Sequence, residues 1–352
     1  MFPTRRITLG GDVFRDEYSL SFDGTNDYVD CGDVSAFDIQ SFTISAWIKI
    51  NDVDYNGILN HYDSNKGYNF FVNNNGVLRT YIGDNSGANS LSAGTALVAN
   101  KWYHCATTYT SGTRKIYLNG VEDGSSSTAV TITFPSGSLI IGEAIDAYMN
   151  GNISDVALYS SALSASQIKT IYNGREPYNH KEGVASSNLV SWWRMGDGAL
   201  DSFNLIGDEV NATIGNELIS NLDFTSGWSS SDTVSSSTTN TFTTTEEAGL
   251  YDENTIVEQV VGKVYKCTLD ATTTASSGFR VKNAGEGTIY LEHGSTSNYS
   301  DSFYFIAKHA TFQIRNISAG TITVNSISVK EVNGNAGVMT NMSANDFTGD
   351  TP

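Results

Sequence analysis

Apolar and polar residues alternate along much of this chain, and this alternation limits its fold more strongly than any other feature. In FTISAWIKI (42–50), every second residue is apolar, from Phe42 to Ile50. Neighbouring side chains of a β-strand point to opposite faces, so the run predicts an antiparallel strand with one buried face. The other face is predicted to hold the residues between them, which are Thr43, Ser45, Trp47 and Lys49.

Further runs of this kind follow between residues 57 and 159, separated by turn residues. They include GILNH, YNFFVN, VLRTYIG, KWYHCATTY, RKIYLNG, SLIIG and ISDVALY. Asn119 and Gly120 form a strong signal for a two-residue hairpin. Only 16% of the residues are charged and 33 are glycine, a composition that suits short strands joined by turns. The pattern predicts an all-β sandwich.

One segment, SASQIKTIYNG, has helical spacing instead. Ser164 and Gln167 stand where an N-cap and its capping-box partner are found, and Gly174 stands where a helix ends. Ile168 and Ile171 recur on one side. The segment predicts a single short amphipathic helix.

Charge and cysteine content exclude several classes of protein. A net charge of −18 repels phosphate, so we expect neither nucleic acid nor an anionic membrane as a partner. No apolar run approaches the roughly 18 residues of a membrane helix, and the start, MFPTRRITLGGDVF, lacks the apolar region of a signal peptide. The cysteines, an odd number at wide spacing, predict buried free thiols in a protein folded in a reducing cytoplasm: Cys31, Cys105 and Cys267.

Three segments together resemble laminin G-like, concanavalin A-type lectin sandwiches. YSLSFDGTNDYVDCGD with FTISAWIKI resembles the opening, and KWYHCATTYTSGTRKIYLNGVEDG the central hairpin. LIIGEAIDAYMNGNISDVALYSSALSASQIKTIYNG resembles the end, with the short helix closing the jelly roll. The resemblance implies two stacked antiparallel sheets over residues 18–180 and a role in binding glycans or proteins, with calcium in some members.

Residues 189–216, LVSWWRMGDGALDSFNLIGDEVNATIGN, resemble a segment that follows such sandwiches in structural proteins of tailed bacteriophages. There it continues into an ending that resembles GVMTNMSANDFTGDTP, which this chain has only at 337–352. We therefore predict a tail element split into residues 181–215 and 333–352, with a domain inserted at 216–332. The alternative is that the two pieces are unrelated turns.

The inserted block, from ELISNLDFTSGW to ISVKEV, resembles jelly-roll carbohydrate-binding modules. In such modules an Asp pair in the last strand helps to hold a structural calcium, but Asn325 and Ser326 stand at that place here. This departure argues against calcium in the insert. The Thr-rich TNTFTTT (239–245) predicts an exposed strand.

The sequence lacks the patterns that catalysis on this fold requires. Glucanases with the concanavalin-type sandwich use carboxylates in an ExDxxE-like strand, and none occurs. Glu143 and Asp146 are three residues apart and would point to opposite faces of a strand, while EEAGLYDE (246–253) is spaced wrongly. No histidine lies in a nucleophile elbow, and His104 is predicted to be structural. We predict that the chain is not an enzyme.

Aromatic residues near turns are the stronger functional lead, because sugars stack on aromatic rings and bind amides through hydroxyls. The candidate glycan contacts are Tyr55, His61, Tyr62 and Tyr68 in the first sandwich, with Trp228 and Tyr299 in the insert. Chance clustering is the alternative, because tyrosine favours sheets and the chain has 18.

Two further groups of residues are candidates for metal binding and for interfaces. Asp63 and Asn65 are candidate calcium ligands, although calcium takes six to eight oxygens and a solvated turn is the favoured reading. Residues 1–17 are predicted to form a docking arm, anchored by Phe2 and Phe14. Trp192 and Trp193 are predicted to anchor the split element, with one ring buried and the other at an interface.

The phage resemblance implies a virion surface protein, such as a fibre, spike or capsid decoration, that binds host or environmental glycans. Its partners would be other virion proteins and further copies of itself, and it would fold in the host cytoplasm. A virion scaffold without a ligand is the first alternative. A glycan-degrading enzyme is the second, and the missing carboxylate pattern counts against it.

Overall fold

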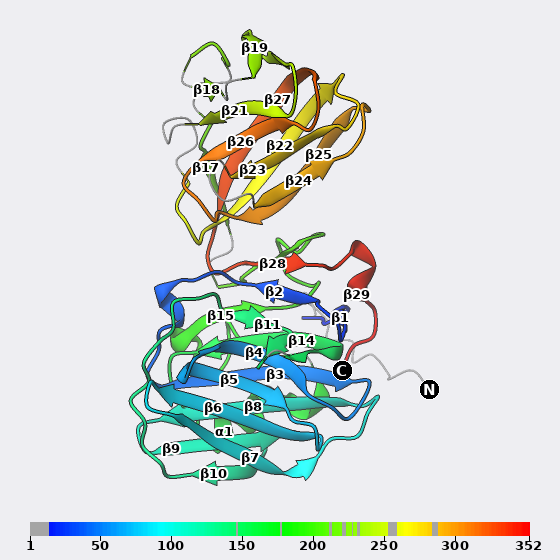
Figure 1. Cartoon of the computed structure of the whole chain (residues 1–352). Coiled ribbons are helices and arrows are strands. Elements are labelled where there is room, and N and C mark those ends of the chain that lie inside the picture. The colour runs from blue at the N-terminus through cyan, green and yellow to red at the C-terminus, as the bar shows by residue number, and fades with distance from the viewer. Residues whose placement is uncertain are drawn as a thin grey trace.

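Two β-sandwiches lie one above the other in the computed structural model (Figure 1). The structure describes residues 14–145, 147–176, 178–210, 213–219, 223–226, 228–230, 233–252, 259–283 and 288–352. Strands of residues 19–206 and 337–348 form the first sandwich, and strands of residues 213–333 form the second. The all-β prediction is confirmed, and the first sandwich is a concanavalin A-like jelly roll.

The first sandwich consists of two eight-stranded sheets. The helix-side sheet has the order β10-β9-β8-β3-β14-β1-β29, with β15 beside β14. Its strands are β1 (Ser19–Asp23), β3 (Phe42–Ile50), β8 (Trp102–Thr110), β9 (Thr113–Leu118), β10 (Val121–Ser126), β14 (Asn150–Tyr159), β15 (Leu189–Trp193) and β29 (Phe347–Thr348).

The front sheet, which faces the viewer in Figure 1, has the order β16-β28-β2-β11-β4-β5-β6-β7. Its strands are β2 (Tyr28–Asp30), β4 (Asn56–Asp63), β5 (Lys66–Val72), β6 (Val77–Asp84), β7 (Ala88–Ala96), β11 (Ile140–Ile141), β16 (Leu205–Ile206) and β28 (Gly337–Thr340). Short 3-10 helices are η1 (Ser35–Phe37), η2 (Asn173–Arg175), η3 (Ser186–Asn188) and η4 (Ala344–Asp346).

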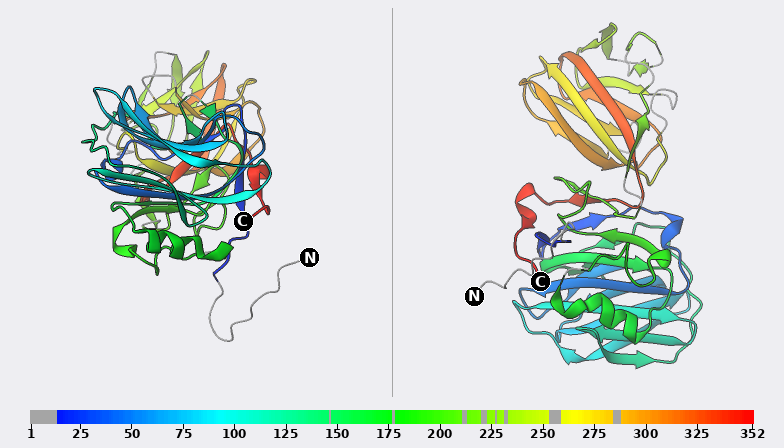
Figure 2. Two further views of the ribbon diagram at one scale, coloured as in Figure 1. Left: turned by 90° about the horizontal axis from the view of Figure 1, so that it is seen from below. Right: turned by 180° about the vertical axis from the view of Figure 1, so that it is seen from behind.

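The helix-side sheet is buried on both faces, which corrects the prediction that β3 is half-exposed. Seen from below in Figure 2, the front sheet, the helix-side sheet and α1 (Ala165–Tyr172) form successive layers. Ile44 and Ile48 pack in the core between the sheets. On the other face Trp47 is 4% exposed and lies against His104 and Tyr172. The alternation did not reveal that a helix covers the more polar face.

Helix α1 begins as predicted and ends at Asn173, one residue before the predicted Gly174. Ser164 accepts a hydrogen bond from the Gln167 backbone, and the Gln167 side chain completes the capping box. Asn173, in the left-handed conformation, ends the helix, and Ile168 and Ile171 are buried. The helix therefore covers the helix-side sheet with its apolar side.

We expect Ser164→Ala to lower the free energy of unfolding by about 1 kcal/mol, because the first turn loses its side-chain acceptor. Urea denaturation followed by far-UV circular dichroism measures this change. Ser164→Thr keeps a capping hydroxyl, so its free energy of unfolding should fall by only a fraction of that amount. Equal losses in the two variants would contradict the capping role.

The two neighbouring tryptophans of β15 are both buried, in different places. Trp192 is 1% exposed and packs in the cluster beneath α1, whereas Trp193 is fully buried in the main core. The Trp193 indole donates to the Asn335 carbonyl at 2.7 Å. Asp208 accepts from the backbone of Trp192 at 3.0 Å and of Asn335 at 3.1 Å. Neither ring lies at an open interface, because each anchors β15 to one side of the sheet.

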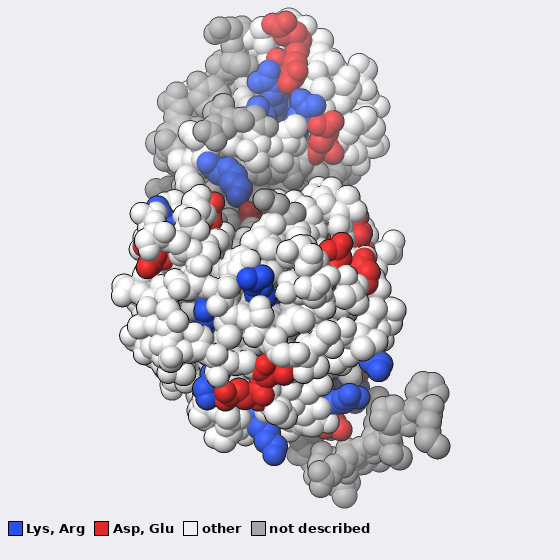
Figure 3. All heavy atoms as spheres, turned by 60° about the horizontal axis from the view of Figure 1, so that its bottom comes forward, with Lys and Arg blue, Asp and Glu red and all other residues white. Residues whose placement is uncertain are grey.

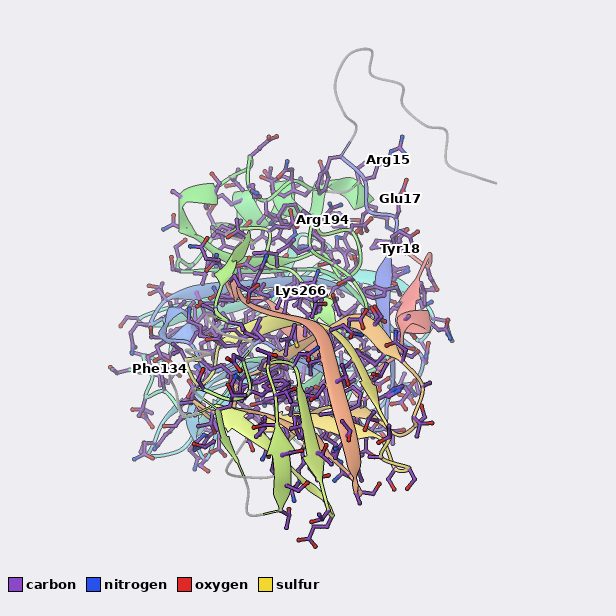
Figure 4. All side chains as sticks on the ribbon, turned by 90° about the horizontal axis from the view of Figure 1, so that it is seen from above. Arg15, Glu17, Tyr18, Phe134, Arg194 and Lys266 are labelled. Atoms are coloured by element: carbon purple, nitrogen blue, oxygen red, sulfur yellow. The ribbon has the colours of Figure 1, made fainter. Side chains whose placement is uncertain are left out.

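Residues 14–17, the described part of the predicted docking arm, bind to the same chain and not to a neighbouring protein. The Phe14 ring lies 5.6 Å from that of Trp192 and 4.5 Å from the Arg194 guanidinium. The Glu17 and Tyr18 amides both donate to Asp197 at 2.8 Å. Figure 4 shows Arg194 beside Arg15, Glu17 and Tyr18. Phe2 and the rest of residues 1–13 lie outside the described residues.

The second sandwich has a six-stranded and a five-stranded sheet, with orders β19-β20-β27-β22-β25 (β17 beside β27) and β18-β21-β26-β23-β24. The strands are β17 (Thr213–Glu217), β18 (Trp228–Ser230), β19 (Val234–Ser237), β20 (Thr241–Thr244), β21 (Ala248–Asp252), β22 (Val264–Thr273), β23 (Phe279–Asn283), β24 (Ile289–His293), β25 (Tyr299–Ile306), β26 (Phe312–Asn316) and β27 (Gly320–Asn333). Its first and last strands pair, with Thr213 opposite Asn333.

Other sequence predictions concern the thiols and membrane segments. The three cysteines are free and buried, as predicted. Burial raises the pKa of the Cys31 thiol well above its ordinary value. Among the helices that the structure describes, none is long and apolar enough to cross a membrane.

Candidate functional site

Two of the predicted glycan contacts, His61 and Tyr68, lie in the core, which corrects their assignment. They are opposite each other on β4 and β5, and they are 1% and 0% exposed. The Tyr68 hydroxyl donates to the Phe37 carbonyl at 2.9 Å. The His61 ring meets that of Tyr68 edge-on, and its Nε2 lies 3.1 Å from Asp38. Both side chains are therefore engaged within the sandwich and face away from solvent.

The other two predicted glycan contacts of the first sandwich, Tyr55 and Tyr62, lie on the outer face of the front sheet. There they join Phe71 of β5 and Tyr81 of β6. Tyr81 lies between its neighbours, with its ring centre 5.9 Å from Tyr62 and 5.3 Å from Phe71. Tyr55, 38% exposed, stacks 6.2 Å from Phe71. The strands thus hold four aromatic rings in one continuous group.

Two asparagine amides lie beside these rings, directly opposite each other on β4 and β5. Asn60 pairs in register with Asn69, and Asn69 pairs with Tyr81. The Asn60 amide donates to Glu143 at 3.1 Å, and the Asn69 Oδ1 accepts from the Tyr81 backbone at 2.9 Å. The remaining atoms, Asn60 Oδ1 and Asn69 Nδ2, are buried and have no hydrogen-bond partner among the described residues. One acceptor and one donor are therefore left unused side by side.

We call Asn60, Tyr62, Asn69, Phe71 and Tyr81 the amide–tyrosine face. An unpaired buried polar atom costs about 1–3 kcal/mol, so two such atoms in one place call for an explanation. Asn69 is 0% exposed, whereas Tyr62 and Tyr81 are half-buried. The two unused amide atoms are therefore closed to solvent, and a ligand reaches them only when a neighbouring side chain moves.

Residues at the border hold this face in position. The Arg79 guanidinium lies 5.2 Å from the Tyr81 ring and donates to Ser90 at 3.2 Å. On the opposite border, a hairpin of β12 (Glu143–Ala144) and β13 (Ala147–Tyr148) passes over β4. A Cβ at Gly57 would lie 2.3 Å from the Glu143 backbone, so only glycine allows this approach. Burial raises the pKa of Tyr62, with smaller effects of Tyr81 and Asp63.

The candidates in the second sandwich are not brought together. Trp228 belongs to β18 and packs edge-on against Phe224 at 5.2 Å. Tyr299 belongs to β25, on the other sheet, and lies edge-on to Phe279 and His293. Burial raises the pKa of Tyr299 to about 12. These two residues do not form one sugar site.

The candidate metal ligands Asp63 and Asn65 belong to the tight turn between β4 and β5. Asn65 has a left-handed backbone, its Oδ1 accepts from the Tyr62 hydroxyl at 3.2 Å, and Asp63 accepts from Ser64 at 2.9 Å. In the second sandwich the Asn325 amide donates to Asp270 at 2.7 Å. Within the described residues, no three His, Cys, Asp or Glu side chains gather in an arrangement for a metal ion.

A histidine and a serine that resemble a catalytic pair lie inside the protein. The His104 Nε2 lies 2.8 Å from the Ser45 hydroxyl, and both residues are 1% exposed. Burial lowers the pKa of His104 to about 3, with Asp155 opposing this effect. A substrate has no access to this pair, which fits the structural role predicted for His104.

Sequence reasoning missed five residues of the amide–tyrosine face and its border: Asn60, Asn69, Phe71, Arg79 and Tyr81. A signal was present, because Asn69 and Phe71 alternate with core residues in YNFFVN, and Arg79 and Tyr81 do so in VLRTYIG. Reading both runs with one register would have placed these side chains on one face.

Residues 23–169 match the family model described as the concanavalin A-like lectin/glucanases superfamily. A comparison with curated protein sequences found no match. Among solved structures, a putative carbohydrate binding protein from Bacteroides ovatus is 21% identical with a TM-score of 0.43, over 55% of this chain and 56% of that one. A heptameric SAP-like pentraxin from Limulus polyphemus is 18% identical with a TM-score of 0.37, over 48% and 85%.

A third similar structure is the IT-sialidase CBM40 from Ruminococcus gnavus bound to sialyllactose, 13% identical with a TM-score of 0.36, over 44% of this chain and 97% of that one. This chain spans little more than half of the Bacteroides ovatus protein. At these identities the similarity concerns the fold.

Proposed function

We propose that the chain binds neutral glycans at the amide–tyrosine face. The observation that carries the proposal is the pair of unused amide atoms, Asn60 Oδ1 and Asn69 Nδ2, at one register position beneath aromatic rings. Two adjacent hydroxyls of a sugar ring would satisfy both atoms, because one hydroxyl donates and the other accepts. The match of residues 23–169 to a lectin superfamily supports this function.

The aromatic rings provide the apolar half of such a site. The rings of Tyr62 and Tyr81 form a platform on which the apolar face of a sugar stacks, while the amides bind its edge. Phe71, which is 1% exposed, lies against the Tyr81 ring and supports it. Both rings are half-buried, so part of each ring is open to a ligand.

Charge favours a neutral ligand over an acidic one. The chain has a net charge of −18, so anions are repelled at long range. On the face shown in Figure 3, the charged side chains form small separate groups with wide uncharged areas between them. The amide–tyrosine face itself contains amides and rings, with one guanidinium, Arg79, and one carboxylate, Glu143, at its borders.

We expect a glycan array probed with the intact chain to report neutral oligosaccharides. Asn60→Ala and Asn69→Ala should each weaken binding about tenfold, since a lost hydrogen bond worth about 1.4 kcal/mol changes Kd by that factor. Asn74→Ala, in an exposed turn, is the matched control and should bind like the unaltered chain. No neutral glycan above background, or equal loss in all three variants, would contradict the proposal.

The place of action that we propose is the surface of a tailed-phage virion, as a fibre, spike or capsid decoration with several copies side by side. The resemblance of residues 189–216 and 337–352 to a segment of phage structural proteins supports this placement. The direct pairing of β16 with β28 fits two parts of one element. We expect antibodies against the first sandwich to label intact particles. Labelling only after disruption would contradict the placement.

The same proposal includes binding without hydrolysis. Beside the amide–tyrosine face, the Glu143 carboxylate is engaged as an acceptor of the Asn60 amide. We expect no release of reducing sugar from the glycans that the array identifies. Hydrolysis that is lost in Glu143→Gln would show an enzyme instead.

A further inference from the structure

A row of side chains runs from the amide–tyrosine face across the front sheet to the second sandwich. The paired positions are Tyr81, Asn69, Asn60, Ile140 and Asp30, on β6, β5, β4, β11 and β2, and Val338 of β28 follows. Paired residues of neighbouring strands point to the same face. With strands about 4.8 Å apart, Asp30 lies roughly 14 Å from Asn69, which is three strand spacings.

At the Asp30 end of this row lies a pocket between the two sandwiches, with a volume of about 370 Å³. The first sandwich contributes Tyr28 and Asp30 from β2 and Val338 to Asn341 from β28 and the residues after it. The second contributes Ile289 and Tyr290 from β24, Tyr304 to Ile306 from β25, and Lys308. The volume is within the usual range of small-ligand pockets.

Polar groups with spare hydrogen-bonding capacity line the pocket. Asp30, 9% exposed, pairs with Lys308 at 3.2 Å and accepts from the Gly32 backbone at 2.9 Å. Within the described part of the chain, the hydroxyls of Tyr28 and Tyr304 have no hydrogen-bond partner. Because the one carboxylate and the one ammonium neutralise each other, the pocket suits an uncharged ligand rich in hydroxyls.

The sandwiches are docked tightly around the pocket, so the site is formed before a ligand arrives. The Asn204 side chain pairs with the Tyr304 backbone through two hydrogen bonds, of 2.8 and 3.1 Å. Gly32 faces Gly262 so closely that a Cβ on Gly32 would lie 2.6 Å from the Gly262 carbonyl. An apolar cluster joins the two sides: Leu205, Val264, Tyr304, Ile306, Val332 and Ala336.

We infer that the inserted sandwich extends the glycan site, so that the ligand is a neutral oligosaccharide chain. One part of the oligosaccharide lies on the amide–tyrosine face. The oligosaccharide then crosses Ile140 and places a further sugar in the interdomain pocket. This inference rests on the proposed function. It explains why a second sandwich is held against this edge of the front sheet, and it predicts that affinity grows with chain length.

Calorimetric titration of the intact chain tests this inference with glucose, xylose and arabinose and with cellohexaose, xylohexaose and arabinohexaose. We expect at least one hexasaccharide to bind ten or more times as tightly as its monosaccharide. The double variant Tyr28→Phe with Tyr304→Phe should remove most of this difference. Tyr172→Phe, the same chemical change on α1, should leave it unchanged. Urea unfolding of each variant shows whether the fold is intact.

The outcomes separate the inference from the proposed function. Equal affinity for monosaccharide and hexasaccharide, or full hexasaccharide affinity in the folded double variant, would overturn the inference. So would the failure of all six sugars while the glycan array finds another ligand. In these cases Asn69→Ala still tests the amide–tyrosine face by itself. An array without any neutral glycan would overturn the proposed function as well.

Discussion

Trp192→Ala should lower the free energy of unfolding of the first sandwich by about 3–5 kcal/mol, the usual cost of removing a large buried aromatic ring. Trp192 is 1% exposed. Its ring centre lies 5.6 Å from that of Phe14 and 5.1 Å from that of His180. Its indole also donates to the buried Asp155, which would lose that partner. Urea denaturation followed by fluorescence measures the change.

Trp102→Ala is the matched control for that substitution. Trp102 is half-buried, and its indole donates to Asp350 near the C-terminus at 2.9 Å. Trp102→Ala should lower the free energy of unfolding clearly less than Trp192→Ala, because less apolar surface is lost from the core. A loss below about 1 kcal/mol in Trp192→Ala, or equal losses in both variants, would contradict the role of Trp192 as an anchor.

Stability should fall as pH rises from about 6.5 to about 8, because of Asp16. Burial, and then the carboxylates of Asp155 and Asp197, raise the pKa of Asp16 to about 8, from an ordinary value of 3.8. Between these values the folded protein holds a proton that the unfolded chain has released, so each rise in pH favours unfolding. His104 has the opposite effect, because burial lowers its pKa from 6.5 to about 3. Its contribution to stability therefore increases with pH only up to about 6.5, where the unfolded chain has released its proton.

Urea unfolding at closely spaced pH values between 6.5 and 8.5 measures the slope of the free energy of unfolding against pH. Asp16→Asn removes the titrating group while it keeps an acceptor for the Ser154 hydroxyl, which lies 3.0 Å from Asp16. We expect the slope to disappear in this variant. Asp84→Asn, at a half-buried residue whose pKa is lowered by hydrogen bonds from Ser86, should retain this pH dependence. A slope that survives in Asp16→Asn would assign the effect to other groups.

Local signals predicted local structure well, since they depend on neighbours in the chain. The capping box of Ser164 and Gln167 is an example. The Thr-rich segment does form a strand, β20, but it is not exposed as predicted, because Phe242 and Thr244 are buried. Alternation also identified β3 and β5, because a period of two needs only a few residues. Which side of a strand faces the core was harder to predict, since Tyr68 and Phe71 are both aromatic but lie on opposite faces of β5.

The candidate site depends on register between strands, which the sequence does not state. Asn60 and Asn69 are on neighbouring strands, and nothing in HYDSNKGYN marks them as partners. The interdomain pocket is less predictable still, because Tyr28, Asn204 and Tyr304 come from distant parts of the chain. Tertiary packing alone brings them together, so only the folded chain reveals the pocket.

The central claim is that sugar hydroxyls bind the unused amide atoms of Asn60 and Asn69. Nitrogen-15 NMR of the side-chain amides, assigned through Asn60→Ala, Asn69→Ala and Asn74→Ala, follows them directly during titration with the strongest neutral oligosaccharide from the array. We predict saturable shifts of the Asn60 and Asn69 signals and an unchanged Asn74 signal. Saturation of the protein by this sugar with both signals unmoved would contradict the claim.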